Sequence, residues 1–175
     1  MVKLSKIYLI MAIVFSIIFC TWSTVRIVNA VSFDVNCTSY IKRAADANTV
    51  EMAKEELSKA IKYAEDNDLT DGIVSIFLKD PQNDIGFWYE NMKASHAELE
   101  SLPEDSTALE KTNVLMKLRE SMTDNEENGI DVTVPNGISI YPHNVIYFWW
   151  GTLSGILTCF FWTMLFIEWM RKLYL

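Results

Sequence analysis

The feature that most restricts the fold is an uncharged stretch of 23 residues near the C-terminus, Val145–Ile167. A helix of this length extends about 34 Å, which is enough to cross a hydrocarbon core of about 30 Å. A second uncharged run, Ile7–Val25, lies near the N-terminus. The two runs predict a mainly α-helical membrane protein, in which two transmembrane helices flank a domain formed by residues 32–143.

The charges that flank the two runs predict the orientation of the chain. Four basic residues lie on the terminal sides of the runs, namely Lys3, Lys6, Arg171 and Lys172, whereas Arg26 stands alone on the domain side of the first run. Short cytoplasmic segments are enriched in such residues. We therefore expect the tails, residues 1–6 and 168–175, in the cytoplasm of a plasma or inner membrane, and residues 32–143 on the extracytoplasmic side.

The first run has a second interpretation, because Met1–Ala30 also resembles a signal peptide with a cleavage site at Val28-Asn29-Ala30. Its 19 uncharged residues are long for the apolar region of a signal peptide. Trp22 and Arg26 are typical of a membrane interface. The sequence favours an uncleaved anchor and leaves cleavage open.

The segment between the runs is strongly acidic. Residues 32–143 contain 22 acidic and 10 basic residues, a net charge of −12. A surface of this charge repels nucleic acids and anionic lipid headgroups, so we expect no nucleic-acid partner. About 112 residues suffice for one compact domain.

Apolar periodicity predicts three helices in this domain. The first extends from a cap at Thr38 to about Asp66, with a break at Asn48-Thr49 left open. The second begins after Asn83 or Asp84 and ends near Leu102. Thr107 and Glu110 form a capping-box pattern for the third helix, which we expect to reach about Asn125. The third helix is predicted to bury Ala108, Leu115, Leu118 and Met122.

A small β-hairpin is predicted at Ile130–Tyr141, where apolar and other residues alternate. A two-residue loop at Asn136-Gly137 would place apolar side chains on opposite faces. A three-residue loop that adds Pro135 pairs Val134 with Ile138 and keeps one apolar face, so we favour that register. Gly72–Leu78 is either a short buried strand or an extended connector.

Two acidic stretches resemble calcium loops only in part. In Asp66–Gly72 the glycine comes one position late, and Asp124–Gly129 lacks the glutamate of position 12. A helix end with a turn is the simpler interpretation of the first. The second places three acids at the negative end of a predicted helix, where cations are favoured.

The sequence predicts no catalytic or metal centre and no cofactor, and we do not expect an enzyme. HExxH, GxSxG and phosphate-loop motifs are absent, and His96 and His143 lie on separate elements. Cys20 and Cys159 differ in expected membrane depth by about 12 Å, which excludes a disulfide between them. Cys37 is expected outside the lipid, accessible to an impermeant thiol reagent.

Small residues recur on one face of each predicted span. They are the candidate helix-packing and assembly residues: Ala12, Ser16, Gly151, Ser154, Gly155 and Thr158, with Cys20 and Ser23 on the same face of the first span. Small faces let helices approach closely in lipid. The face either joins the two spans of one chain or contacts another subunit.

The aromatic cluster Phe87-Trp88-Tyr89 is a candidate surface for a partner or ligand, because its three side chains cannot all face one core. The leading hypothesis is a membrane-anchored interaction module, an accessory subunit that binds other membrane subunits or itself. One alternative is a sensing domain with an apolar pocket near Trp88 and Tyr89. Another is an oligomeric channel with Ser154 and Thr158 facing the lumen.

Overall fold

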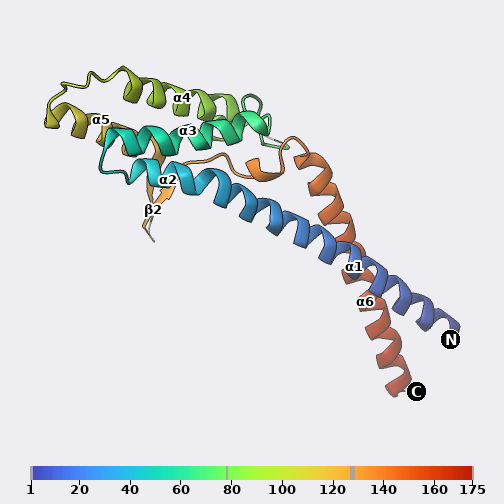
Figure 1. Cartoon of the computed structure of the whole chain (residues 1–175). Helices are drawn as coiled ribbons and strands as arrows, with labels where there is room; N and C mark the ends of the chain where they lie inside the picture. Colours follow the sequence, from blue (N-terminus) through green and yellow to red (C-terminus); the bar gives the residue numbers. More distant parts are fainter. Residues whose placement is uncertain (1, 78, 127–128, 175) are drawn as a thin grey trace. The chain divides into compact units, whose positions relative to one another are not determined.

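The computed structural model describes residues 2–77, 79–126 and 129–174, and it is mainly helical. Two of its helices are long and apolar enough to cross a membrane (Figure 1). The chain divides into two compact units. Residues 1–29 and 143–175 form the first, which we call the helix-pair unit, and residues 30–142 form the second, which we call the acidic domain.

The first long helix does not stop where the apolar run ends. Helix α1 (Val2–Phe33) continues through a π-helical segment, Asp34–Thr38, into α2 (Ser39–Ala45). The predicted cap at Thr38 is therefore wrong, because Thr38 has helical backbone angles and its side chain caps nothing.

The π-helical segment has a packing consequence. Buried residues follow one another at intervals of four, namely Phe33, Cys37, Ile41 and Ala45. This interval is longer than the 3.6 residues of an α-helical turn, so the buried face would rotate around a regular helix. The wider π turn offsets that rotation and keeps the four side chains on one buried face.

The first predicted helix is divided at the position that the sequence left open. Helix α3 (Val50–Asp66) begins after Thr49, whose hydroxyl accepts a hydrogen bond of 3.2 Å from the backbone N–H of Met52. The acidic domain therefore has four packed helices among its described residues instead of three. Helix α2 contacts α3, α3 contacts α4, α4 contacts α5, and α5 returns to α2 (Figure 1).

The other two helices begin where the sequence predicted. Asp84 caps α4 (Ile85–Ser101) by accepting a 3.0 Å hydrogen bond from the Phe87 N–H. Thr107 and Glu110 form the expected capping box of α5 (Ala108–Met122). The predicted burial of α5 is confirmed at Leu118 and Met122 and is wrong at Ala108, which is exposed.

The predicted small antiparallel sheet is present, but its strands are not the predicted pair. Strand β1 (Thr123–Glu126) pairs with β2 (Gly129–Val132), with Thr123 opposite Val132. Ile138–Ile140 forms a 3₁₀ helix, so the register that paired Val134 with Ile138 is wrong. Gly137, in the predicted loop, has a left-handed conformation with φ of 87°.

The early end of α5 explains why the sheet uses other strands than the predicted pair. This helix stops at Met122, three residues earlier than predicted, and the Met122 carbonyl accepts a 2.9 Å hydrogen bond from the Thr133 N–H. Asp124 and Glu126 therefore lie in strand β1, and Glu127 is outside the described residues. The like-charge conflict with the helix C-terminus that the sequence suggested does not arise.

The segment after α3 is a connector that makes one isolated bridge, between Ile73 and Asp84. Val74 is buried, and Gly72 has a φ of 108°, which a side chain would disfavour. A Cβ atom at Gly72 would also overlap the Tyr141 hydroxyl. Within the acidic domain, the glycine thus lets the connector lie against Tyr141.

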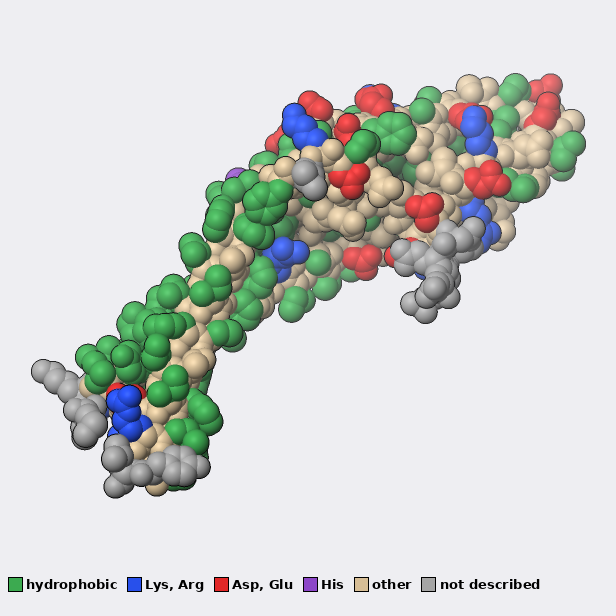
Figure 2. Space-filling model, turned by 180° about the vertical axis from the view of Figure 1, so that it is seen from behind, with side chains coloured by type: hydrophobic (Ala, Val, Ile, Leu, Met, Phe, Trp, Pro, Cys, Tyr) green, Lys and Arg blue, Asp and Glu red, His purple; other side chains and the backbone are tan. Residues whose placement is uncertain are grey.

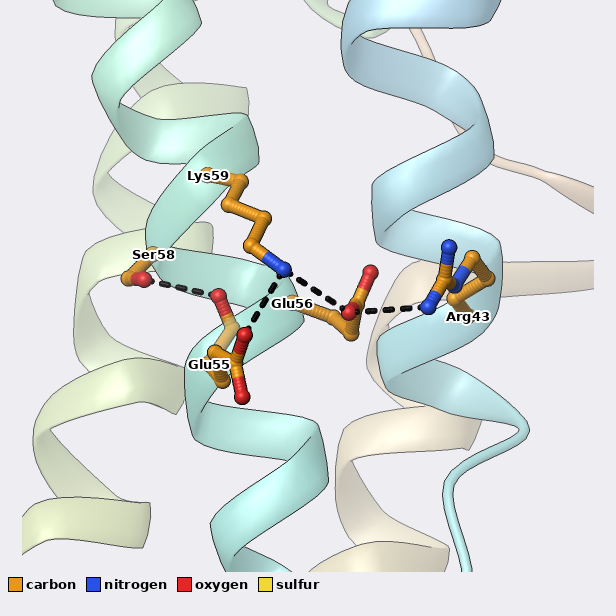
Figure 3. A network of polar contacts seen from close by, with 5 residues as sticks. All are labelled: Arg43, Glu55, Glu56, Ser58 and Lys59. Atoms are coloured by element: carbon orange, nitrogen blue, oxygen red, sulfur yellow. Dashed lines mark hydrogen bonds and ion pairs between the residues drawn. The ribbon is translucent and has the colours of Figure 1, made fainter.

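A buried carboxylate joins α2 to α3 (Figure 3). Glu56 is 6% exposed, and its Oε1 accepts hydrogen bonds of 3.0 Å from both Arg43 Nη2 and Lys59 Nζ. Its Oε2 has no hydrogen-bond donor among the described residues. The Arg43 side chain is 65% exposed and the Lys59 side chain is 40% exposed, so both are far more accessible than Glu56. Removal of the two cations would therefore leave a buried charge without a partner, whereas removal of Glu56 would leave two cations that water can still solvate.

This asymmetry gives a first prediction. The double substitution Arg43→Ala and Lys59→Ala leaves the Glu56 carboxylate buried without a donor, so it should lower the thermal unfolding midpoint by several degrees. Lys62→Ala with Lys93→Ala removes two exposed ion pairs and is the matched control, with little expected change. In a Glu56→Leu background, the double substitution at Arg43 and Lys59 should no longer lower the unfolding midpoint. If it lowers the midpoint there by the same amount, the burial of the Glu56 charge is not the cause.

The expected accessibility of Cys37 is wrong. Its side chain is fully buried, with Sγ 3.9 Å from the Ala60 carbonyl oxygen. Burial raises the pKa of this thiol to about 12. The reactive thiolate is therefore both scarce and shielded.

A maleimide should consequently fail to label Cys37 in the folded protein. In a Cys20→Ser, Cys159→Ser protein, we expect labelling at least about 100-fold slower than after denaturation in SDS. Asn113→Cys, an exposed position on α5, is the positive control in a background that lacks the three native cysteines. Mass spectrometry measures both, and equal rates for Cys37 and the control would refute the buried placement.

Candidate functional site

The helix-pair unit is held together by side chains of α1 and α6 (Asn144–Tyr174). The predicted small residues Ala12 and Ser154 are buried, with exposures of 0% and 4%. Gly151 faces Trp22, because a Cβ atom there would overlap the six-membered ring of that indole. Gly155 faces Phe19, and a Cβ atom at this glycine would lie 3.3 Å from the phenyl ring. The glycines thus make room for aromatic rings of α1.

Two indole N–H groups are paired across this unit. Trp22 Nε1 donates a 2.7 Å hydrogen bond to the Tyr147 carbonyl, and Trp162 Nε1 donates a 3.1 Å bond to Ser16 Oγ. An N–H in an apolar environment is costly without an acceptor, and each of these finds its acceptor on the other helix. Phe15 also stacks on Phe161, with ring centroids 5.5 Å apart.

The remaining small residues of α6 bond within their own helix. Ser154 Oγ donates to the Trp150 carbonyl at 2.6 Å, and Thr158 Oγ1 donates to the Ser154 carbonyl at 2.7 Å. These hydroxyls are satisfied locally and need no polar partner. The sequence did not identify Phe19, Tyr147 and Trp162 as members of this contact, and Trp22 was expected only at an interface. Glycine spacing alone does not indicate which rings will fill the space above it.

A second small-residue stripe remains open on α1. A cleft of about 470 Å³ lies along this helix. Its lining residues belong mainly to one face of α1: Ile13, Ser16, Ile17, Cys20, Thr21, Thr24, Val25 and Trp162. Thr21 and Thr24 donate hydrogen bonds of 2.9 Å to the carbonyls of Ile17 and Cys20. The surface of the cleft is therefore effectively apolar.

The three aromatic residues that begin α4 have different environments. Phe87 is 73% exposed, whereas Trp88 and Tyr89 are each 7% exposed. The Tyr89 hydroxyl donates a 2.7 Å hydrogen bond to Glu65 Oε1, and this bond raises the pKa of Tyr89 to about 12. Trp88 packs near Phe33 in the core and also lines a surface groove of about 670 Å³.

That groove is not the apolar pocket that the sensing hypothesis predicted. It includes Trp88 but not Tyr89, and its wall is partly polar. Figure 2 shows acidic side chains over the acidic domain and hydrophobic ones along the two long helices. His96 lies 3.8 Å from Glu100, and no group of three potential metal ligands occurs among the described residues.

Comparison of the chain with protein-family models, with curated proteins and with solved structures finds no match. A functional assignment therefore depends on the geometry of the helix-pair unit and of the acidic domain.

The notch at Gly151, meaning the space that its missing side chain leaves for the Trp22 ring, gives a prediction for the helix pair. Gly151→Ala forces the Trp22 ring to move and should destabilise the protein by about 1–3 kcal/mol relative to Gly155→Ala, which has more room. Both substitutions change helix propensity equally, so the pair is matched. In a Trp22→Ala background the difference should vanish in a double-mutant cycle measured by thermal unfolding in detergent. A difference that persists would contradict the contact between Gly151 and Trp22.

Proposed function

We propose that this protein is a membrane-anchored interaction module, an accessory subunit of a larger membrane assembly. The observation that supports this most is the unequal use of the two small-residue faces. The face of α6 with Gly151 and Gly155 is filled by rings of α1. The stripe of α1 with Ser16, Cys20 and Thr24 lines a cleft that nothing in the helix-pair unit fills.

A transmembrane helix is the occupant that fits this cleft. Helices associate in lipid by close packing, and small residues flanked by branched ones form a groove for the ridge of another helix. Ile13 and Ile17 are both exposed beside the small stripe, at 46% and 61%. The partner helix belongs to another membrane subunit or to a second copy of this chain.

The flanking charges support the proposed placement in the membrane. Lys3 and Lys6 lie between the N-terminus and the first apolar run, and Arg171 and Lys172 lie between the second run and the C-terminus, which favours cytoplasmic termini. The acidic domain, residues 30–142, then lies on the extracytoplasmic side. In this arrangement the two long helices provide both the anchor and the contact with the partner helix.

Filling the cleft tests this proposal. Cys20→Leu with Thr24→Leu should release the protein from its assembly and lower its apparent mass on native separation in mild detergent. The chain provides a matched control, because Thr163 donates to the Cys159 carbonyl on an exposed face of α6 just as Thr24 does to Cys20 on α1. Cys159→Leu with Thr163→Leu should leave the mass unchanged. Identical masses for both variants and the unaltered protein would refute the proposed contact.

A further inference from the structure

Residues near both ends of the chain line one pocket of the helix-pair unit. Ser5, Lys6 and Leu9 of α1 form one side, and a stripe of α6 that ends at Lys172 forms the other. The volume of this pocket is about 410 Å³, which is within the range of ligand-binding sites. Figure 2 shows basic side chains beside hydrophobic ones at this end of the long helices. The pocket is therefore built by the helix pair and not by the surface of a single helix.

The lining changes from apolar to basic along both helices. On α6 the lining residues Leu165, Trp169 and Lys172 follow one another at intervals of four and three, so they share one face of the helix. Leu9 and Lys6 of α1 are three residues apart and share a face as well. On each helix the leucine lies toward the middle of the apolar run, and the lysine lies toward the chain terminus. The pocket thus has an apolar inner part and a basic rim.

The charged groups of the rim have no partner within the protein. Lys6 and Lys172 are exposed, and neither forms an ion pair with another described residue. Glu168 also lines the pocket, is half-buried, and forms no ion pair within the same described part of the chain. Two lysines against one glutamate give the lining a net charge of +1. A ligand with one negative charge balances it.

An indole ring between the two parts of the pocket independently indicates a lipid. Trp169 lies between Leu165 and Lys172 in the lining, and it is 56% exposed. Tryptophan is enriched at the level of the lipid headgroups, because its ring is apolar and its N–H group is polar. This position places the boundary between acyl chains and headgroups at the rim, beside the two lysines.

We propose that this pocket binds an anionic phospholipid with one negative charge, such as phosphatidylglycerol. Lys6 and Lys172 donate charge-assisted hydrogen bonds to the phosphate, and an acyl chain contacts Leu9 and Leu165. Basic pockets between transmembrane helices at the cytoplasmic surface are suited to anionic headgroups. A water-soluble anion would leave the apolar part of the pocket without a partner. This inference rests on the membrane placement proposed above, but not on the proposed partner helix.

Native mass spectrometry of the full-length protein in neutral detergent tests this site. Phosphatidylglycerol and phosphatidylcholine with identical acyl chains are added at equal concentrations, and we expect at least about fivefold more bound phosphatidylglycerol. Lys172→Gln should lower the binding of phosphatidylglycerol about fivefold, the usual contribution of one lysine near an anionic headgroup. Arg171→Gln is the matched control, because Arg171 is the adjacent exposed cation and lies outside the lining. It should change binding less than about twofold.

Glu168→Gln gives an expectation of the opposite sign. It raises the net charge of the lining to +2 and should strengthen the binding of phosphatidylglycerol, which loss of a merely structural residue would not do. Unchanged or weaker binding in this variant would contradict the proposal.

Other outcomes would overturn the proposal as well. Equal losses for Lys172→Gln and Arg171→Gln would reduce the attraction to the general charge of the tails. Equal binding of the two lipids, or an unaffected Lys172→Gln variant, would exclude recognition of the headgroup. Displacement by glycerol phosphate at a concentration equal to that of the lipid would indicate a soluble phosphate ligand. Extraction of the unaltered protein from membranes by alkaline carbonate would instead refute the membrane anchor, and this site with it.

Discussion

The constraint on which most of the structure depends concerns the two helices that are long and apolar enough to span a membrane, because a backbone in hydrocarbon must satisfy its hydrogen bonds within its own helix. Helix α1 meets this requirement from Val2 to Phe33, and its ladder continues through the π-helical segment into α2. The same continuous ladder therefore forms the apolar helix and begins the core of the acidic domain, where Cys37 and Ile41 are fully buried. If this segment were a flexible linker instead of a helix, ordering Cys37 and Ile41 in the core would cost additional conformational entropy.

Local signals in the sequence were sufficient wherever a structure depends on neighbouring residues. The caps at Asp84 and Thr107 follow from side chains that satisfy the N–H groups of the next turn, so they could be predicted without knowledge of the fold. The predicted hairpin failed because Ile138–Ile140 forms a 3₁₀ turn instead of a strand, and the apolar alternation in the sequence does not distinguish these two structures. Ile138 was free to alternate in a strand, but its N–H bonds to the Pro135 carbonyl in a 3₁₀ turn. The low β-propensity of Thr123–Glu126 was overridden by its pairing with β2.

The candidate site shows the same limit. The small residues of both long helices could be located from their spacing, and Gly151 does occupy a contact. Spacing could not indicate that Trp22 fills the notch, because an indole ring and a helix backbone both require the absence of a side chain at that position. The hydrogen bond from Trp22 Nε1 to the Tyr147 carbonyl holds the indole ring at Gly151, because it gives the polar N–H an acceptor. Rings of α1 therefore fill the face of α6 at Gly151 and Gly155, whereas the stripe of α1 with Cys20 and Thr24 lines an open cleft.

The charge imbalance of the acidic domain explains why a groove without cations can exist at all. With 22 acidic and 10 basic residues between positions 32 and 143, most carboxylates cannot have a cationic neighbour. The available cations are concentrated on the outer faces of the helices, as in Lys62 with Asp66 and Lys117 with Glu98. Carboxylates in water tolerate this because hydration replaces the missing partner. Asp124 and Asp131 in the wall of the groove are exposed, so water solvates their carboxylates as it does those on the outer faces of the helices.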